Sequence, residues 1–281
     1  MVNVTAPDSN LRRVRYGICL ANIGTYADPR ASVRVARAAE QYGWEGVFVW
    51  DHLAFVWGPP AADPWVTLSA IACATSRIRL GTSVTPVARR RPQVLAQAVA
   101  TLDVLSGGRF VFGAGLGGTD SEFAAFGEPT DARVRAEKLD EGLELLRRLW
   151  SGEEVTHHGA HYDVDGVTLA PLPVQDPLPI WIGGNRAASI RRAARWDGWL
   201  ADSADPTGMT LSAADVGARI ETIRAARIAD GPFEVGVLGQ TDRAEAAGYA
   251  DAGATWWLEN LHDRRGTPEE ILAIVAAGPP S

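Results

Sequence analysis

Two patterns of apolar and polar residues alternate along this chain. Short, almost entirely apolar runs predict buried strands, and longer stretches with apolar residues three and four positions apart predict helices that bury one face. The predicted strands are Tyr16–Ala21, Glu45–Trp50, Ile78–Val84, Arg109–Gly115, Leu178–Ile182, Trp199–Ala201, Phe233–Leu238 and Thr255–Leu258. The predicted helices are Arg30–Tyr42, Pro64–Thr75, Arg91–Leu105, Asp120–Phe126, Asp131–Trp150, Ala187–Arg195, Ala213–Ala229, Ala244–Ala252 and Pro268–Ala276. Eight strand–helix pairs favour an α/β fold, an eight-stranded parallel (β/α) TIM barrel.

The segment 78–118 is the clearest strand–helix–strand unit and predicts a parallel pair of strands. Both strands end in small residues, at Gly81–Pro86 and Gly113–Gly118. In parallel α/β folds the functional residues lie at the carboxyl ends of the strands. Small residues there allow a flat ligand to lie against the backbone. An open doubly wound sheet is the alternative, but no GxGxxG motif follows the first strand.

The regular alternation breaks at 151–177, which is polar and rich in Gly and Pro. This stretch predicts a small hairpin inserted at the barrel rim before the fifth strand. The whole chain, 1–281, is interpreted as a single barrel domain in which the polar residues 1–14 form a flexible tail.

Composition narrows the functional classes. Net charge is −7, which argues against nucleic acid as a partner. No run of 18 apolar residues is present, so we expect no membrane span. Cys19 and Cys73 show neither a pairing pattern nor a zinc-ligand spacing. Together these features predict a reduced, cytoplasmic enzyme with a small-molecule substrate.

Asp51 and His52 follow the second strand directly, where a barrel places its catalytic groups. A histidine transfers protons near neutral pH, and an adjacent carboxylate can orient its ring. His52 and Asp51 are therefore the candidate catalytic residues. A structural His–Asp pair at a strand end is an equally good interpretation.

Two glycine-containing strand ends are candidate ligand-binding segments. After the fifth strand, Gly183 and Gly184 precede Asn185 and a helix, an arrangement that can present backbone amides to a phosphate or carboxylate. A tight strand-to-helix turn is the alternative. Ser83–Pro86 offers hydroxyls and amides at the third strand end, and Gly115–Gly118 alone is a weak signal.

Three other clusters have competing interpretations. Arg89–Arg91 is either a solvated surface or the holder of an anionic cofactor tail. The hairpin histidines lack matching ligand spacing, so no metal site is expected; they are His157, His158 and His161. Glu259 and Asn260 end the eighth strand, as substrate contacts or as part of a salt bridge at the rim.

Seven segments occur in an order and spacing more specific than any one of them. They are Val47–Leu53, Leu80–Pro86, Pro92–Gly117, Glu122–Gly127, Lys138–Gly152, Pro179–Gly184 and Trp196–Leu200. As a set they resemble the bacterial-luciferase-like superfamily of flavin- and deazaflavin-dependent oxidoreductases. The resemblance spans about Tyr16–Gly278 and implies a barrel with an insertion before the fifth strand, usually a homodimer, that uses FMN or coenzyme F420.

The resemblance also implies roles for individual residues. Ser83–Val84 matches the position of a non-prolyl cis peptide that supports the ring in deazaflavin-using relatives. His52 matches their histidine beside the ring, and Gly183–Gly184 matches their phosphate site. The complete set of predicted cofactor-binding residues is Asn22, Ser83, Val84, Thr85, Gly115, Gly117, Gly183, Gly184 and Asn185.

One departure from the family pattern bears on the substrate. Sugar-phosphate dehydrogenases of the group carry a catalytic glutamate just after the fourth strand, where this chain has Gly117–Gly118. The favoured function is hydride transfer between F420 and a small organic substrate. The alternatives are an FMN-dependent monooxygenase that uses oxygen and a non-catalytic flavin-binding relative. A metal-dependent barrel hydrolase is disfavoured by the absent ligand spacing.

Overall fold

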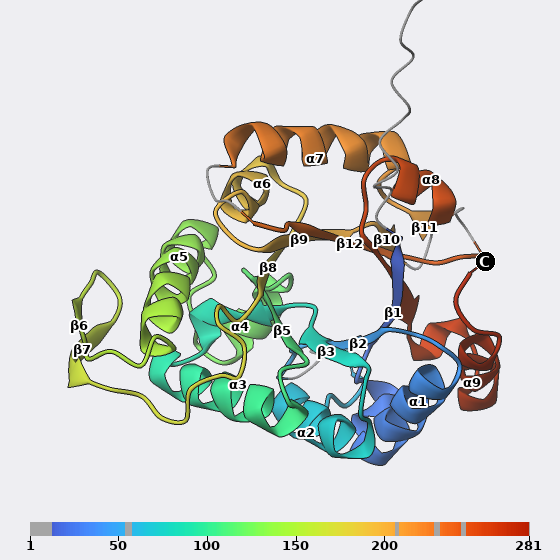
Figure 1. Ribbon diagram of the computed structural model, residues 1–281, viewed down its shortest axis with the longest axis horizontal. Helices are drawn as coiled ribbons and strands as arrows, with labels where there is room; N and C mark the ends of the chain where they lie inside the picture. Colours follow the sequence, from blue (N-terminus) through green and yellow to red (C-terminus); the bar gives the residue numbers. More distant parts are fainter. Residues whose placement is uncertain (1–12, 54–57, 206–207, 228–230, 243–245, 281) are drawn as a thin grey trace, which may run out of the picture.

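Eight parallel strands close into a barrel in the computed structural model, which describes residues 13–53, 58–205, 208–227, 231–242 and 246–280 (Figure 1). The strands are β1 Arg15–Leu20, β2 Gly46–Val49, β3 Arg79–Thr82, β5 Phe110–Gly115, β8 Ile180–Gly183, β9 Gly198–Asp202, β12 Glu234–Gly239 and β13 Trp256–Leu261. Each pairs with the next around the ring, and pairing between β3 and β5 closes it. The predicted TIM barrel is confirmed.

Helices surround the barrel where the sequence predicts them. They are α1 Pro29–Gln41, α2 Pro64–Ala74, α3 Pro92–Ser106, α4 Asp120–Ala125, α5 Ala132–Leu149, α6 Ala187–Ala193, α7 Ala213–Ala226, α8 Ala246–Asp251 and α9 Pro268–Ala276. Short 3-10 turns occur at η1 Gly24–Ala27, η2 Val87–Arg89 and η3 Asp263–Arg265. Local signals fix the boundaries: the Asp63 side chain caps α2 by accepting from the Val66 amide at 2.9 Å, and Gly107 ends α3 at φ 67°. No described helix carries an apolar stretch of the length that a bilayer requires.

The core has two layers. Apolar residues on the outer faces of the strands pack against the helices, and a separate cluster fills the barrel interior. Inside, the Phe48 and Trp181 rings stack with centroids 5.6 Å apart, and Trp256 packs edge-on against both. These rings fill the lower barrel, which is the amino-terminal half of its interior, and form a floor beneath the carboxyl end.

The insertion before β8 is the predicted hairpin, formed by β6 Val155–His158 and β7 Asp163–Val167. It projects outward from α5, away from the barrel centre (Figure 1). His157 Nε2 lies 3.0 Å from a Glu141 oxygen, and His161 Nε2 lies 3.4 Å from one of Glu137. Both histidines therefore fasten the hairpin to α5. Of the predicted tail 1–14, residues 1–12 lie outside the described part.

Candidate active site

The third strand is interrupted at the predicted position. β3 ends at Thr82, the Ser83–Val84 peptide is cis, and β4 (Thr85–Pro86) then continues against β5. The Thr82 hydroxyl donates to the Gly113 carbonyl at 2.7 Å. A β-carbon on Gly113 would lie 1.8 Å from the Thr82 carbonyl oxygen, so only glycine fits beside this bulge. The cis peptide expected from the family resemblance is confirmed.

Val84 lies in a cradle formed by two glycines. A β-carbon on Gly115 would lie 2.5 Å from Val84 Cγ2, and one on Gly183 would lie 2.6 Å from Val84 Cγ1. Both distances are far below a normal carbon–carbon contact. The missing side chains on β5 and β8 therefore allow the bulge to lie across the carboxyl end of the barrel.

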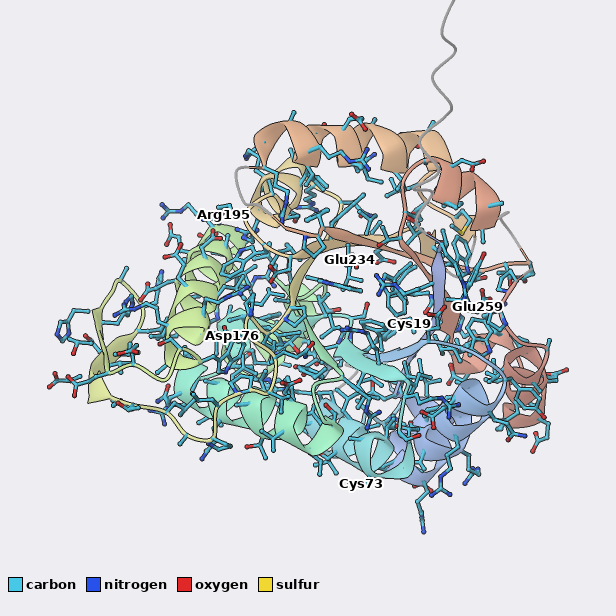
Figure 2. All side chains as sticks on the ribbon, in the orientation of Figure 1. Cys19, Cys73, Asp176, Arg195, Glu234 and Glu259 are labelled. Carbon is cyan, nitrogen blue, oxygen red and sulfur yellow. The ribbon has the colours of Figure 1, made fainter. Side chains whose placement is uncertain are left out.

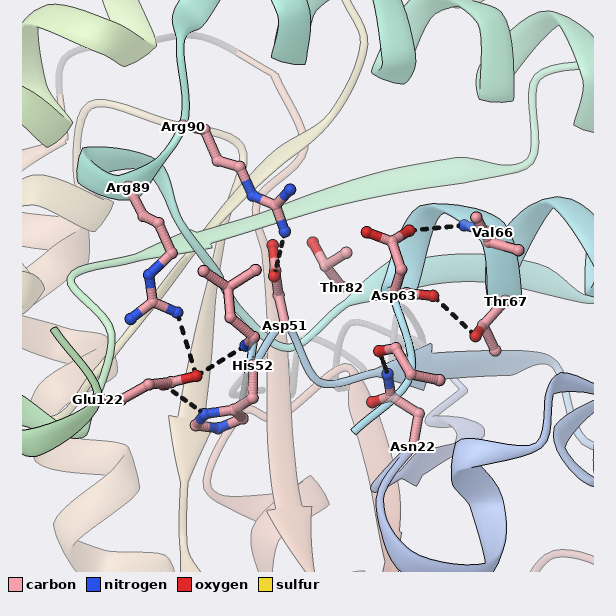
Figure 3. A network of polar contacts seen from close by, with 12 residues as sticks. Asn22, Asp51, His52, Asp63, Val66, Thr67, Thr82, Arg89, Arg90 and Glu122 are labelled. Atoms are coloured by element: carbon pink, nitrogen blue, oxygen red, sulfur yellow. Dashed lines mark hydrogen bonds and ion pairs between the residues drawn. The ribbon is translucent and has the colours of Figure 1, made fainter. Parts of the chain in front are cut away.

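Asp51 and His52 lie in the loop directly after β2, and their side chains have different partners. His52 Nδ1 lies 2.9 Å from Glu122 Oε2, and the Leu53 amide donates to Glu122 Oε1 at 2.7 Å (Figure 3). Asp51 instead pairs with Arg90. The expectation that Asp51 orients His52 is wrong: Glu122, from α4, occupies that position.

Arg89 supports Glu122 from the side away from the histidine. Its Nη1 lies 3.4 Å from Glu122 Oε1, its Nε donates to Glu128 Oε2 at 2.9 Å, and its guanidinium lies 4.2 Å from the centre of the Phe123 ring. The Arg89 side chain is only 2% exposed. One buried cation therefore contacts both Glu122 and Glu128 and holds them together.

The Asp51–Arg90 ion pair secures the same strand end from outside (Figure 3). Burial raises the pKa of the Asp51 carboxyl, and the adjacent Arg90 opposes that rise. Arg89 and Arg90 thus pair with protein carboxylates, which leaves Arg91 as the member of the arginine run suited to an external anion.

In the loop after β8, donors that the glycine pattern suggests for a ligand already have hydrogen-bond partners within the protein. The Gly184 amide donates to the Leu200 carbonyl at 3.2 Å, so it contributes space rather than a donor. A β-carbon on Gly184, at φ +114°, would lie 2.8 Å from the Ser189 hydroxyl oxygen. Asn185 Nδ2 donates to the Asp202 carbonyl at 2.6 Å, while its buried Oδ1 has no hydrogen-bond partner.

The remaining predicted residues lie around the same end of the barrel. Asn22 Nδ2 donates to the Ala62 carbonyl at 2.7 Å, and its buried Oδ1 has no hydrogen-bond partner. Thr85 is buried in β4. Gly117 has φ +80°, and a β-carbon there would lie 2.8 Å from the Phe123 ring.

Of the pair that ends the eighth strand, Glu259 forms the salt bridge: it accepts from Arg265 Nη1 at 2.6 Å and from Trp257 Nε1 at 3.0 Å. Asn260 Oδ1 is buried without a hydrogen-bond partner.

Sequence reasoning missed Glu122. The residue lies within the family-like segment Glu122–Gly127, on a short helix that follows a glycine-rich strand end. An acidic residue at that place was the available signal. The fold supplies what the sequence could not, a contact with His52 across 70 positions of chain.

A family model described as luciferase-like monooxygenase matches residues 15–273. The chain belongs to this family. The match covers the whole barrel, including β1, β13 and most of α9.

Curated relatives match over part of their length. An F420-dependent glucose-6-phosphate dehydrogenase of Nakamurella multipartita is 39% identical over 182 residues, 62% of this chain and 52% of the relative. An F420-dependent hydroxymycolic acid dehydrogenase of Mycobacterium tuberculosis is 37% identical over 184 residues, 64% of this chain and 51% of the relative. The matched region thus spans about half the length of these relatives.

Among solved structures, the coenzyme F420 dependent tetrahydromethanopterin reductase from Methanopyrus kandleri has a TM-score of 0.74 at 16% identity, covering 95% of this chain and 98% of the other. At that identity the similarity establishes the shared fold.

Proposed function

We propose that this family member is an oxidoreductase that transfers a hydride between coenzyme F420 and a small organic substrate. The observation that carries the proposal is the Val84 cradle, in which Gly115 and Gly183 leave no room for a β-carbon. The family resemblance implies a cofactor ring at this surface. Two similar proteins are named as F420-dependent dehydrogenases, which supports the deazaflavin over FMN.

The residues around this surface fit such a cofactor. Ser83, Val84 and Thr85 would support one face of the ring, and Gly183, Gly184 and Asn185 would accommodate the phosphate arm. The unpartnered Oδ1 atoms of Asn22 and Asn185 are acceptors available to bound hydroxyl or ring N–H groups. Gly117 would keep the β5 end clear. When bound, F420 accepts or delivers the hydride.

The protein's own part is to hold the substrate and move a proton. Glu122 fixes the His52 ring through Nδ1, so that proton exchange with the substrate takes place at the other ring nitrogen. Asp51, paired with Arg90, anchors the strand end from outside and so positions His52 without touching the substrate. The apolar side chains that fill the lower barrel exclude water from the floor of the site.

Titration of the purified protein with F420 and, separately, with FMN tests the assignment. We expect F420 to bind and FMN to bind at least about ten-fold more weakly, a difference of about 1.4 kcal/mol. Tight FMN binding without F420 binding would overturn it. The His52→Ala variant should keep F420 affinity and lose about 10²-fold or more in kcat. Unchanged turnover would remove His52 from the mechanism and favour a non-catalytic relative.

An FMN-dependent monooxygenase is the second candidate, favoured by the description of the matching family model. Oxygen consumption coupled to substrate oxidation in the presence of reduced FMN distinguishes it. F420 reduction under anaerobic conditions, with no need for oxygen, supports the first candidate.

We further propose a cytoplasmic homodimer. Val66 on α2 and Val94 on α3 are 62% and 58% exposed, and such apolar side chains on adjacent helices suit a second copy of the chain. Neither Cys19 nor Cys73 forms a disulfide, in keeping with a reducing compartment. Light scattering and cell fractionation test the two statements.

A further inference from the structure

Three polar residues lie on the inner wall of the barrel at its carboxyl end, the end at which the bulge also lies. Alternation along β9 places Asp202 on the same face as the interior residue Leu200, and Gln240, directly after β12, follows the interior residue Leu238 by two positions. On β13, Asn260 follows the interior residue Leu258 by two positions and lies opposite Cys19 of β1 in register.

Two of these side chains have unsatisfied buried polar atoms. Gln240 is 1% exposed and Asn260 is 5% exposed. Neither amide atom of Gln240 has a hydrogen-bond partner, and neither does Asn260 Oδ1. Leaving such groups unpaired costs stability, which is why buried polar groups in native proteins normally have partners. Unpaired amides on the inner wall of a barrel mouth point to a ligand that satisfies them.

Asp202 shows that water reaches this wall. It is exposed although it faces inward, and its carboxylate has no ion-pair partner among the described residues. Desolvation by the surrounding wall, and secondarily repulsion from Asp205, raise the pKa of the Asp202 carboxyl. A second anion in the same place would be repelled.

We infer that Asp202, Gln240 and Asn260 form the substrate-binding surface, and that its substrate is a neutral polyhydroxylated alcohol rather than a phosphate ester. This inference rests on the proposed hydride transfer. An amide both donates to and accepts from hydroxyl groups, and a carboxylate accepts from two hydroxyls at once. The same carboxylate disfavours the phosphate that a sugar-phosphate substrate would bring.

Calorimetric titration with matched pairs of probes tests the inference. The pairs are glycerol, ribose and glucose, each against its terminal phosphate ester, added to the protein with and without F420. Wherever a pair binds, we expect the neutral compound to bind at least about ten-fold tighter than its phosphate ester. The reason is that repulsion between the ester and the Asp202 carboxylate costs more free energy than a single hydrogen bond to a charged group contributes. Tighter binding of the esters, equal binding, or no binding of any neutral member would overturn the inference.

Variants locate the binding surface. Asp202→Asn should weaken the binding of the neutral compounds by about ten-fold and reduce the ratio of their affinity to that of the phosphate esters. Asp165→Asn, an exposed carboxylate in the hairpin, should change neither. An Asp202→Asn variant that behaves like Asp165→Asn would contradict the assignment.

A second pair of variants separates binding from folding. Gln240→Leu removes an unpartnered amide, so we expect weaker polyol binding with an unchanged or higher Tm. Gln175→Leu removes an amide that donates to Asp103 Oδ1 at 2.8 Å and to the Phe110 carbonyl at 2.7 Å, so its Tm should fall. A fall in Tm for Gln240→Leu, with polyol binding intact, would make that amide structural. A protein that binds polyols but not F420 would refute the cofactor assignment and leave this surface standing.

Discussion

Gly115→Ala is the most informative single substitution, because it fills the cradle under Val84 with one methyl group. The new β-carbon would lie 2.5 Å from Val84 Cγ2 and 3.4 Å from Val84 Cβ. Carbon atoms in contact are normally about 3.5–4.0 Å apart. Val84 therefore has to move by about 1 Å, and the closely packed interior resists such a shift.

The substitution should have two measurable effects. Overpacking of this kind costs about 1–3 kcal/mol, so we expect the free energy of unfolding to fall by that amount. Displacement of Val84 also alters the surface proposed for the ring, and F420 affinity should fall by about ten-fold or more, equivalent to about 1.4 kcal/mol.

The chain offers a matched control and a matched rescue. A β-carbon on Gly118 would meet nothing within 4 Å, and its φ is not positive, so Gly118→Ala should change stability by less than about 0.5 kcal/mol. Val84→Ala removes the methyl carbons that clash, so Gly115→Ala should cost little in that background, as a double-mutant cycle measures. Urea unfolding followed by tryptophan fluorescence, and F420 fluorescence titration, provide the data. If Gly115→Ala matches Gly118→Ala, or if Val84→Ala leaves its cost unchanged, the cradle is not a packing constraint.

Three further predictions concern single contacts. Glu122→Gln should lower kcat by about 10²-fold and alter its pH profile while F420 affinity stays unchanged; a purely structural role would instead weaken F420 binding. Arg90→Leu leaves the Asp51 carboxylate buried without its cation, so unfolding free energy should fall by about 3 kcal/mol near pH 8. Because the charged form of a carboxyl with a raised folded-state pKa is disfavoured in the native protein, the stability lost in Arg90→Leu should become smaller as pH falls. Adding Asp51→Asn should restore most of the lost stability, as measured by urea unfolding. Burial raises the pKa of the Cys19 thiol to about 12, whereas Cys73 is exposed at the periphery (Figure 2). A thiol reagent should therefore modify Cys73 alone in the native protein, as the number of labels found by mass spectrometry would show. Labelling of Cys19 before unfolding would contradict the buried position of its thiol.

The barrel itself was accessible from the sequence, because each strand is a short apolar run and each helix carries its own boundary signals. Pro64 and its cap Asp63 are examples of signals that act within a few residues. The strand break at Ser83–Val84 could be predicted only from the family resemblance. The break after Thr82 depends on room beside β5, which Gly113 provides from a strand that is distant in sequence.

Side-chain pairing at the site was the least predictable part. Asp51 and His52 are adjacent in sequence, yet each pairs with a residue from another part of the fold. Whether the Glu122 carboxylate can reach His52 depends on where α4 and the loop after β2 lie. That placement is a tertiary property, and the family-like segment that contains Glu122 does not reveal that its side chain is buried against His52.

Strand alternation also explains how one barrel end can serve two ligands. On β5 and β8 the inner positions near the mouth are Gly115 and Gly183, so the wall there is backbone and suits a flat ring. On β9, β12 and β13 the corresponding inner positions carry Asp202 and two amides, so the wall there is polar and suits hydroxyl groups. A hydride moves only between atoms held in contact, and facing walls of opposite character bring a ring and an alcohol together from opposite sides. His52, in the loop after β2, would then lie at the boundary where the proposed reaction releases a hydroxyl proton as the hydride leaves.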